Sequence, residues 1–386
     1  MQPTVGIDFG TSFAYTAVMD GPSPATVPTA EGGKALPALV AVAQNGRRLV
    51  GSPAQNVALT NAENTVHGVK RLLGHRASSG AARTIAAMVP FRMARSGEDE
   101  VFIKLPGWNA RPVEIGAMIL AEQRQQATQY LDQQVYEAVL SVPSYFTAAQ
   151  TAAMIEAARL AGFRDVSTIE DPVAPARAYG HNDRPGTIVA VYHLGGGTFE
   201  VSLLSIGAVT TEVVDTAGDA FLGGETIDDS IMEWFVSRCR VQYGVDLTHN
   251  TLALQSLRPA VQLAKRRLSE REEAEIVLPF TKGGQTRDLR FTLDRAELEQ
   301  MTRPLLKRTL EITSGMLRRA GILVDGISAV LLVGGQTRMP LVQHEVGRFF
   351  GRAPSLAPAP EEVIALGACM GASAGGGDDE LELAYY

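Results

Sequence analysis

The stretch "VYHLGGGTFEV" (residues 191–201) decides the fold, because its pattern occurs twice in the chain. An apolar strand runs into three glycines and Thr198, then returns to alternating apolar residues. Glycine runs allow backbone N–H groups to approach phosphate oxygens, since no Cβ intervenes. The residues alone leave two interpretations open, a phosphate-binding turn or an ordinary glycine-rich hairpin. A phosphate–magnesium site normally has a carboxylate at the strand end, whereas this strand ends with His193.

A second stretch, "TVGIDFGTSFAYTAVMDG" (4–21), has the same layout. Two apolar strands flank the small, hydroxylated turn 10–12, which indicates a β-hairpin. Asp8 and His193 occupy equivalent strand ends in the two hairpins. Because the pattern occurs twice, two unrelated glycine-rich turns are a poorer explanation of it than a pair of phosphate-binding hairpins. The pair predicts a ligand held between two related halves.

The intervening segments alternate between helix and strand signals. Apolar spacing predicts a long helix over 114–135 and a buried strand over 137–146. Thr147 and Gln150 form a capping box that should start the next helix. The stretch 228–305 is expected to be largely helical. Residues 326–351 predict a buried strand, two glycines and a helix.

These elements predict an α/β fold with two lobes, each a mixed sheet with flanking helices. The first lobe is expected over 1–185, with a small subdomain at 38–110. The second is expected over 186–375, with a small subdomain at 226–305. The acidic tail 376–386 should be flexible.

Composition narrows the class of protein. The 386 residues include 35 basic and 42 acidic side chains, which argues against a general nucleic-acid binder. There is no run of eighteen apolar residues and no signal-peptide pattern at the start, so we expect no membrane association and a cytoplasmic location. Cys239 and Cys369 are too few for a disulfide framework or a zinc site.

Several segments, in matching order and spacing, resemble the nucleotide-binding domain of the seventy-kilodalton heat-shock chaperones (DnaK type), within the actin and hexokinase superfamily. The resemblance covers essentially residues 3–375 and implies a two-lobed, actin-like ATPase fold that binds ATP or ADP with Mg²⁺. The segments are "GIDFGTSFAYTAVMDG", "VKRLLG", "SVPSYFTAAQTAAMIEAARLAGF", "IEDPVAPARAYG", "VYHLGGGTFEVSLL", "GDAFLGGETID", "LAKRRLS" and "VLLVGGQTRMPLVQ".

The resemblance assigns roles residue by residue. It implies nucleotide contacts from Gly10, Thr11, Ser12, Gly195, Gly196, Gly197, Gly223, Gly224, Lys265, Arg266, Ser269, Gly334, Gly335 and Arg338. It implies magnesium partners at Asp8 and Glu200, and a catalytic group of Lys70, Asp171, Thr198 and His193. Taken without the resemblance, Lys265 and Arg266 could also form the solvated face of a helix, which is the minor alternative.

Three positions depart from the family pattern. Asp171 stands where the family has glutamate, His193 where it has aspartate, and Glu200 where it has aspartate. Neutral imidazole supplies no charge for magnesium. We therefore expect weak or slow hydrolysis, and we expect nucleotide binding to strengthen as pH falls through an imidazole titration near about 6.5.

Two functions remain open. One is a chaperone-type domain whose slow ATP hydrolysis is coupled to lobe rotation, with no substrate-binding domain in this chain and with a co-chaperone, exchange factor or client protein as partner. The other is a catalytically inactive regulatory or scaffold protein that uses ATP as a structural switch. A sugar kinase is disfavoured, because the segments resemble the chaperone branch.

Overall fold

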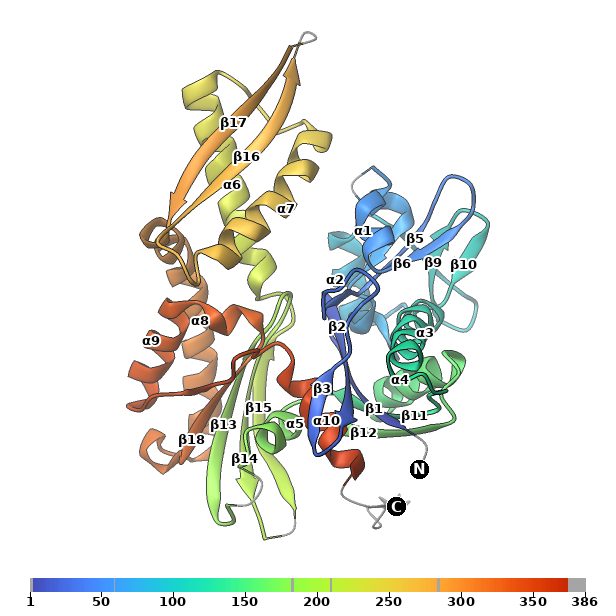
Figure 1. Cartoon of the computed structure of the whole chain (residues 1–386), viewed down its shortest axis with the longest axis vertical. Helices are drawn as coiled ribbons and strands as arrows, with labels where there is room; N and C mark the ends of the chain where they lie inside the picture. Colours follow the sequence, from blue (N-terminus) through green and yellow to red (C-terminus); the bar gives the residue numbers. More distant parts are fainter. Residues whose placement is uncertain (1–2, 59, 182–183, 209, 283–284, 374–386) are drawn as a thin grey trace.

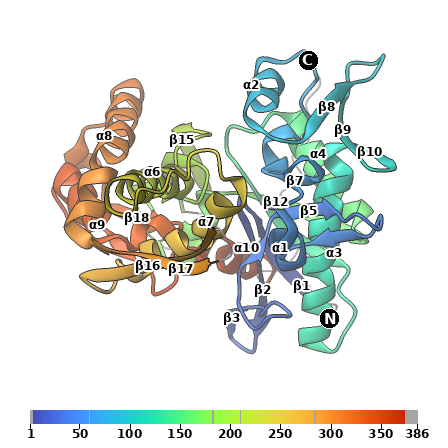
Figure 2. The same cartoon turned by 90° about the horizontal axis from the view of Figure 1, so that it is seen from above.

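The computed structural model describes residues 3–58, 60–181, 184–208, 210–282 and 285–373. The expected flexible tail, 376–386, lies outside the described residues. The chain forms two lobes that stand side by side and join at one end (Figures 1 and 2). The α/β fold class and the two-lobed architecture predicted from the sequence are confirmed.

Each lobe contains a sheet of the same topology. The first sheet has the order β3 (Ser23–Thr26), β2 (Phe13–Asp20), β1 (Thr4–Phe9), β11 (Glu137–Val142), β12 (Asp165–Glu170), and β4 (Leu36–Pro37) also pairs with β2. The second has the order β15 (Thr211–Asp219), β14 (Phe199–Ile206), β13 (Thr187–Leu194), β18 (Ala329–Val333), β19 (Ser355–Leu356). In both sheets the first three strands pair antiparallel and the remaining pairs are parallel. The chain thus builds the same sheet twice.

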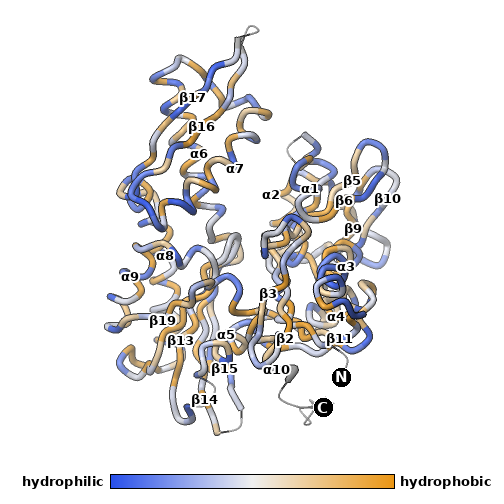
Figure 3. Tube along the Cα trace, viewed as in Figure 1, coloured by the Kyte–Doolittle hydropathy of each residue, from blue (hydrophilic) through white to orange (hydrophobic). Residues whose placement is uncertain are grey.

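The central strands are buried because helices cover the sheets. Helices α3 (Pro112–Leu131) and α4 (Ala148–Leu160) pack together in the first lobe, and α8 (Arg295–Ala320) and α9 (Pro340–Phe350) in the second. Strands covered in this way have apolar residues in succession, as "VAVY" in β13 shows. Figure 3 shows the apolar colour concentrated along these strands. The predicted capping box of α4 is confirmed by the reciprocal bonds of Thr147 and Gln150.

Two short helices join the lobes. Helix α5 (Val173–Ala178) packs against β13, β15 and β18, whereas α10 (Val363–Ser373) packs against α5, β1 and β2. Helices α5 and α10 pack closely where they cross, because a Cβ at Gly367 of α10 would lie 1.8 Å from the carbonyl oxygen of Ala174 in α5. The last described helix of the chain therefore packs on the first sheet (Figure 1).

Smaller structures extend from the far end of each lobe and face each other across a gap between the ribbons in Figure 1. In the first lobe they are β5 (Leu39–Val42), β6 (Arg48–Val50), β7 (Thr65–His67), β8 (Arg92–Arg95), β9 (Val101–Leu105), β10 (Trp108–Ala110), α1 (Ser52–Ala58) and α2 (Gly80–Met88). In the second lobe they are α6 (Gly224–Tyr243), α7 (Thr251–Arg267), β16 (Glu273–Lys282) and β17 (Gln285–Asp294).

The expectation that 228–305 is largely helical is wrong over the β16–β17 hairpin. Alternate residues of both strands are buried and paired across the hairpin, as Ile276 with Phe291 and Leu278 with Leu289. This two-residue period is a strand signal that the flanking helical patterns concealed.

Among the described residues, none of the helices combines the length and the apolarity that a membrane span requires.

Candidate active site

A cavity of about 550 Å³ lies between the lobes, where the turns of the two hairpins meet. Most of the residues that the sequence singled out line it: Asp8, Gly10, Thr11, Ser12, Lys70, Asp171, His193, Gly195, Gly196, Gly197, Thr198, Glu200, Gly224, Lys265, Arg266, Gly334, Gly335 and Arg338. The lining does not include Gly223 and Ser269. A Cβ at Gly223 would lie 2.6 Å from the Gly196 carbonyl oxygen, so this glycine packs against the second turn. Ser269 lies just after α7, where its amide donates to the Arg266 carbonyl.

Glycine is required where the turns approach other atoms. A Cβ at Gly196 would lie 2.7 Å from Ser12 Oγ on the facing turn. Gly334, which follows β18, has a φ of +88°, and a Cβ there would lie 2.4 Å from the Leu194 carbonyl oxygen. The cavity therefore has walls of backbone at its centre, with amides accessible to an anion.

Lys70 and Asp171 form a buried ion pair in the lining of the cavity. Lys70 lies in the 3-10 turn η2 (Val69–Leu72), and its Nζ is 3.3 Å from Asp171 Oδ2. Asp171 follows β12 directly, and its amide donates to the Val142 carbonyl. The other oxygen, Oδ1, is buried and has no hydrogen-bond partner among the described residues. It is therefore free to accept a hydrogen bond from a water or a ligand in the cavity.

Two further acids of the cavity, Asp8 and Glu200, bind protons more tightly than usual. Burial raises the pKa of Asp8 to about 7, partly offset by the charge of Lys70 and reinforced by that of Asp171. Burial and the charge of Asp171 likewise raise the pKa of Glu200 to about 7. Glu200 accepts hydrogen bonds from Ser202 (3.2 Å) and Ser144 (3.4 Å). Both acids are therefore partly protonated at neutral pH.

His193 lies at the end of β13, directly opposite Glu200 in the strand register. Burial lowers the pKa of His193 to about 4; the charge of Asp171 opposes this shift and that of Lys70 adds to it. The imidazole is thus neutral at pH 7. Burial therefore moves the titration of this ring below the value near 6.5 from which the pH dependence of nucleotide binding is expected, and that pH dependence stays a prediction.

On the other side of the cavity, acids fix the cationic side chains of Lys265 and Arg338 but not that of Arg266. Lys265 pairs with Asp228 at 2.7 Å and donates to the Gly224 carbonyl at 2.7 Å. Its side chain is only 11% exposed, so it does not belong to a solvated helix face. Arg266 is exposed, as that alternative expects, but it also lines the cavity. Arg338 makes a two-pronged contact with Glu361, at 2.8 and 3.0 Å.

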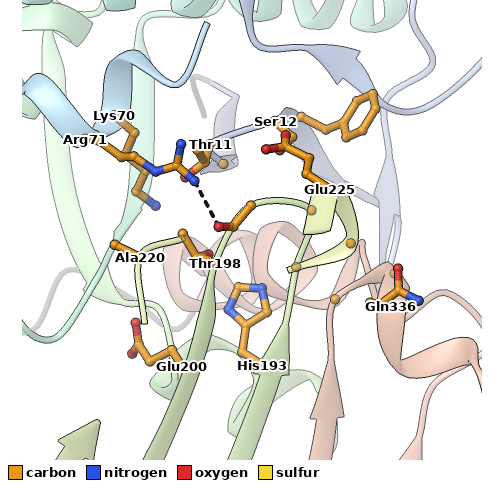
Figure 4. A pocket seen from close by; sticks show the side chains of 18 of the residues that line it. Thr11, Ser12, Lys70, Arg71, His193, Thr198, Glu200, Ala220, Glu225 and Gln336 are labelled. Carbon is orange, nitrogen blue, oxygen red and sulfur yellow. Dashed lines mark hydrogen bonds between the residues drawn. The ribbon is translucent and has the colours of Figure 1, made fainter. Parts of the chain in front are cut away.

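Two cavity residues that the sequence analysis missed connect the lobes. Ser12 donates to Glu225 Oε1 at 2.6 Å, and Arg71 Nη2 donates to the Gly197 carbonyl at 2.9 Å (Figure 4). Arg71 adjoins Lys70 in "VKRLLG", and Glu225 lies in "GGETID". Nothing in either motif distinguishes these side chains from solvated ones, so only the folded structure brings them to the cavity.

The structure offers magnesium little direct ligation. Among the described residues, no three histidine, cysteine, aspartate or glutamate side chains converge to hold a metal ion. Asp8 and Glu200 both reach the cavity. Carboxylates that do not converge can still accept hydrogen bonds from the waters that magnesium retains. Asp8 and Glu200 therefore fit a hydrated magnesium ion that arrives with the nucleotide better than an ion bound permanently by protein side chains.

Comparison with protein families agrees with this geometry. The family model described as Hsp70 protein matches residues 4–383, nearly the whole chain. In three dimensions the matched segments form two sheets of the same topology, with glycine turns that face each other and a buried lysine between these turns. The chain therefore belongs to the Hsp70 family, as a chaperone-type ATP-binding domain.

Proposed function

We propose that this domain binds ATP and ADP between its lobes and hydrolyses ATP slowly. The observation that carries the proposal is the neutral imidazole of His193 beside a glycine cradle that is otherwise complete. Binding depends on the cradle, whereas the rate of hydrolysis depends on how the charge at the terminal phosphate is stabilised.

Each group in the cavity has a defined task in this proposal. Backbone amides of the two turns receive the phosphates, and Lys70 places a positive charge at the terminal phosphate. The free Oδ1 of Asp171 accepts a hydrogen bond from the attacking water and so orients it. Thr198 offers its hydroxyl from the second turn. Magnesium, when bound with the nucleotide, would neutralise phosphate charge, with Asp8 and Glu200 accepting hydrogen bonds from its waters.

The adenosine would lie between Arg266 and Arg338, on the side of the cavity where Lys265 is fixed. A guanidinium is planar and stacks on a base. Arg338 is held in place by Glu361, which reduces the conformational entropy that stacking would cost.

We further propose that nucleotide exchange changes the angle between the lobes, since the helices that join them, α5 and α10, lie at one end of the molecule. A co-chaperone, exchange factor or client protein would respond to that angle. A cytoplasmic location is part of the same proposal.

Single-turnover hydrolysis of prebound ATP tests the proposal. The wild type should hydrolyse slowly, and His193→Asp should raise magnesium-dependent turnover about tenfold, equivalent to 1.4 kcal/mol of barrier. Adding Asp171→Glu should raise turnover further, because the longer side chain brings the carboxylate closer to the water. A fast wild type that His193→Asp slows would contradict the proposal and give His193 a direct catalytic role. Tight binding without any turnover, in wild type and variants, would instead favour the structural-switch function.

A further inference from the structure

We infer that Arg71 recognises the terminal phosphate and makes the domain selective for the triphosphate over the diphosphate. This inference rests on the proposed nucleotide binding and assigns a residue that neither the sequence motifs nor the family match singles out.

The position of the guanidinium supports the assignment. Arg71 extends from η2 in the first lobe to the second turn, where Nη2 donates to the Gly197 carbonyl at 2.9 Å. A Cβ at Gly197 would lie 2.6 Å from the same nitrogen, so the guanidinium lies against the cradle itself. Figure 4 shows its side chain beside Lys70, above the turn.

Arg71 also retains unused hydrogen-bonding capacity. Its Nε is buried and has no hydrogen-bond partner among the described residues. A guanidinium carries five N–H donors in a planar fork, which matches phosphate oxygens. The guanidinium carbon of Arg71 also lies 5.0 Å from the centre of the Phe221 ring, and this contact restricts the guanidinium to the side of the cavity where Phe221 lies. A phosphate in the cradle would therefore meet a cation that is already in place.

Glu225 explains why a cation is needed there. One oxygen accepts the bond from Ser12, and the other lies 3.4 Å from a Cβ built on Gly197. This carboxylate at the cradle would repel a phosphate. Burial lowers the pKa of Arg71, while the charge of Glu225 opposes that change. We therefore assign two tasks to Arg71: it compensates Glu225 and donates to the phosphate that ADP lacks.

Calorimetric titration of the whole chain with ADP and with the β,γ-imido analogue of ATP, in EDTA and in magnesium, tests the assignment. Arg71→Ala should weaken the analogue about 30-fold in EDTA and ADP less than about threefold, as expected for loss of a charge-assisted contact. Arg71→Lys should recover part of the loss. The matched control is Arg76→Ala, which removes an exposed arginine from the same segment. Urea unfolding checks that each variant is folded.

Glu225→Gln gives a second test, because it removes the repulsion but can still accept from Ser12. It should tighten the analogue more than ADP. An equal loss of both nucleotides in Arg71→Ala would overturn the inference and leave Arg71 as a link between the lobes. Absence of binding by the wild type would contradict the proposed function itself, so the two failures are distinguishable.

Discussion

The two hairpins share one backbone plan but place their side chains in opposite order. In the first, Asp8 is the last residue but one of β1 and Tyr15 is its partner across the strands. In the second, His193 is the last residue but one of β13 and Glu200 is its partner. Each hairpin thus presents one acid and one aromatic ring to the cavity, with the positions exchanged. If the side chains repeated as closely as the sheets do, two carboxylates would lie at equivalent strand ends.

This exchange separates binding from chemistry. Backbone amides do not depend on the strand-end side chain, so in the proposed function both turns would still receive phosphate. The carboxylate that would face the triphosphate from the second strand end is replaced by a ring that stays neutral at pH 7. One lobe therefore retains its acid at the strand end, while the other has moved it to the neighbouring strand.

The largest expected effect comes from blocking the backbone of one of the two turns while leaving the other unchanged. Gly196→Val should reduce ATP and ADP affinity more than about 100-fold, because a Cβ at this position lies 2.7 Å from Ser12 Oγ and the larger side chain fills the phosphate space. Calorimetry measures the affinity. Gly97→Val is the control, since an added Cβ there meets no atom within 4 Å. Unchanged affinity in Gly196→Val would place the phosphates elsewhere.

A second, smaller effect concerns how the two strand ends respond to pH. The folded protein binds fewer protons at His193 than the unfolded chain between about pH 4 and 6.5, so this residue makes stability rise with pH in that window. Asp8 binds more protons when folded between about pH 4 and 7, so it makes stability fall with pH there.

Urea unfolding across pH 4–8 therefore distinguishes the hairpins. His193→Gln should steepen the fall in stability with rising pH, by on the order of 2 kcal/mol over the window. Asp8→Asn should have the opposite effect. Superimposable pH profiles of both variants and the wild type would show that neither group is perturbed by burial.

The smallest expected effect comes from a residue outside both hairpins, so it serves as a reference for the effects of changes within them. Arg338→Ala removes a cation that Glu361 holds near the third turn, Gly334–Gly335. It should weaken ATP and ADP equally, by about 1 kcal/mol, because stacking on adenine does not depend on the number of phosphates. Competition binding with both nucleotides measures this. Selective loss of ATP would place Arg338 at the phosphate end instead.

The sequence by itself determined the repeated strand–glycine–strand units, the capped helices and the family. These features are local: glycine runs, capping boxes and apolar spacing express the conformational preferences of a few adjacent residues. The same local patterns concealed the β16–β17 hairpin, where a two-residue period lies between strong helices.

Only the tertiary structure decided the protonation of the site and the contacts between the lobes. The pKa values of His193 and Glu200 depend on burial and on the charge of Asp171, which comes from a distant part of the chain. Arg71 reaches Gly197 only once the lobes face each other. Desolvation and charge–charge interactions depend on distance in space rather than along the chain, so no local pattern encodes them.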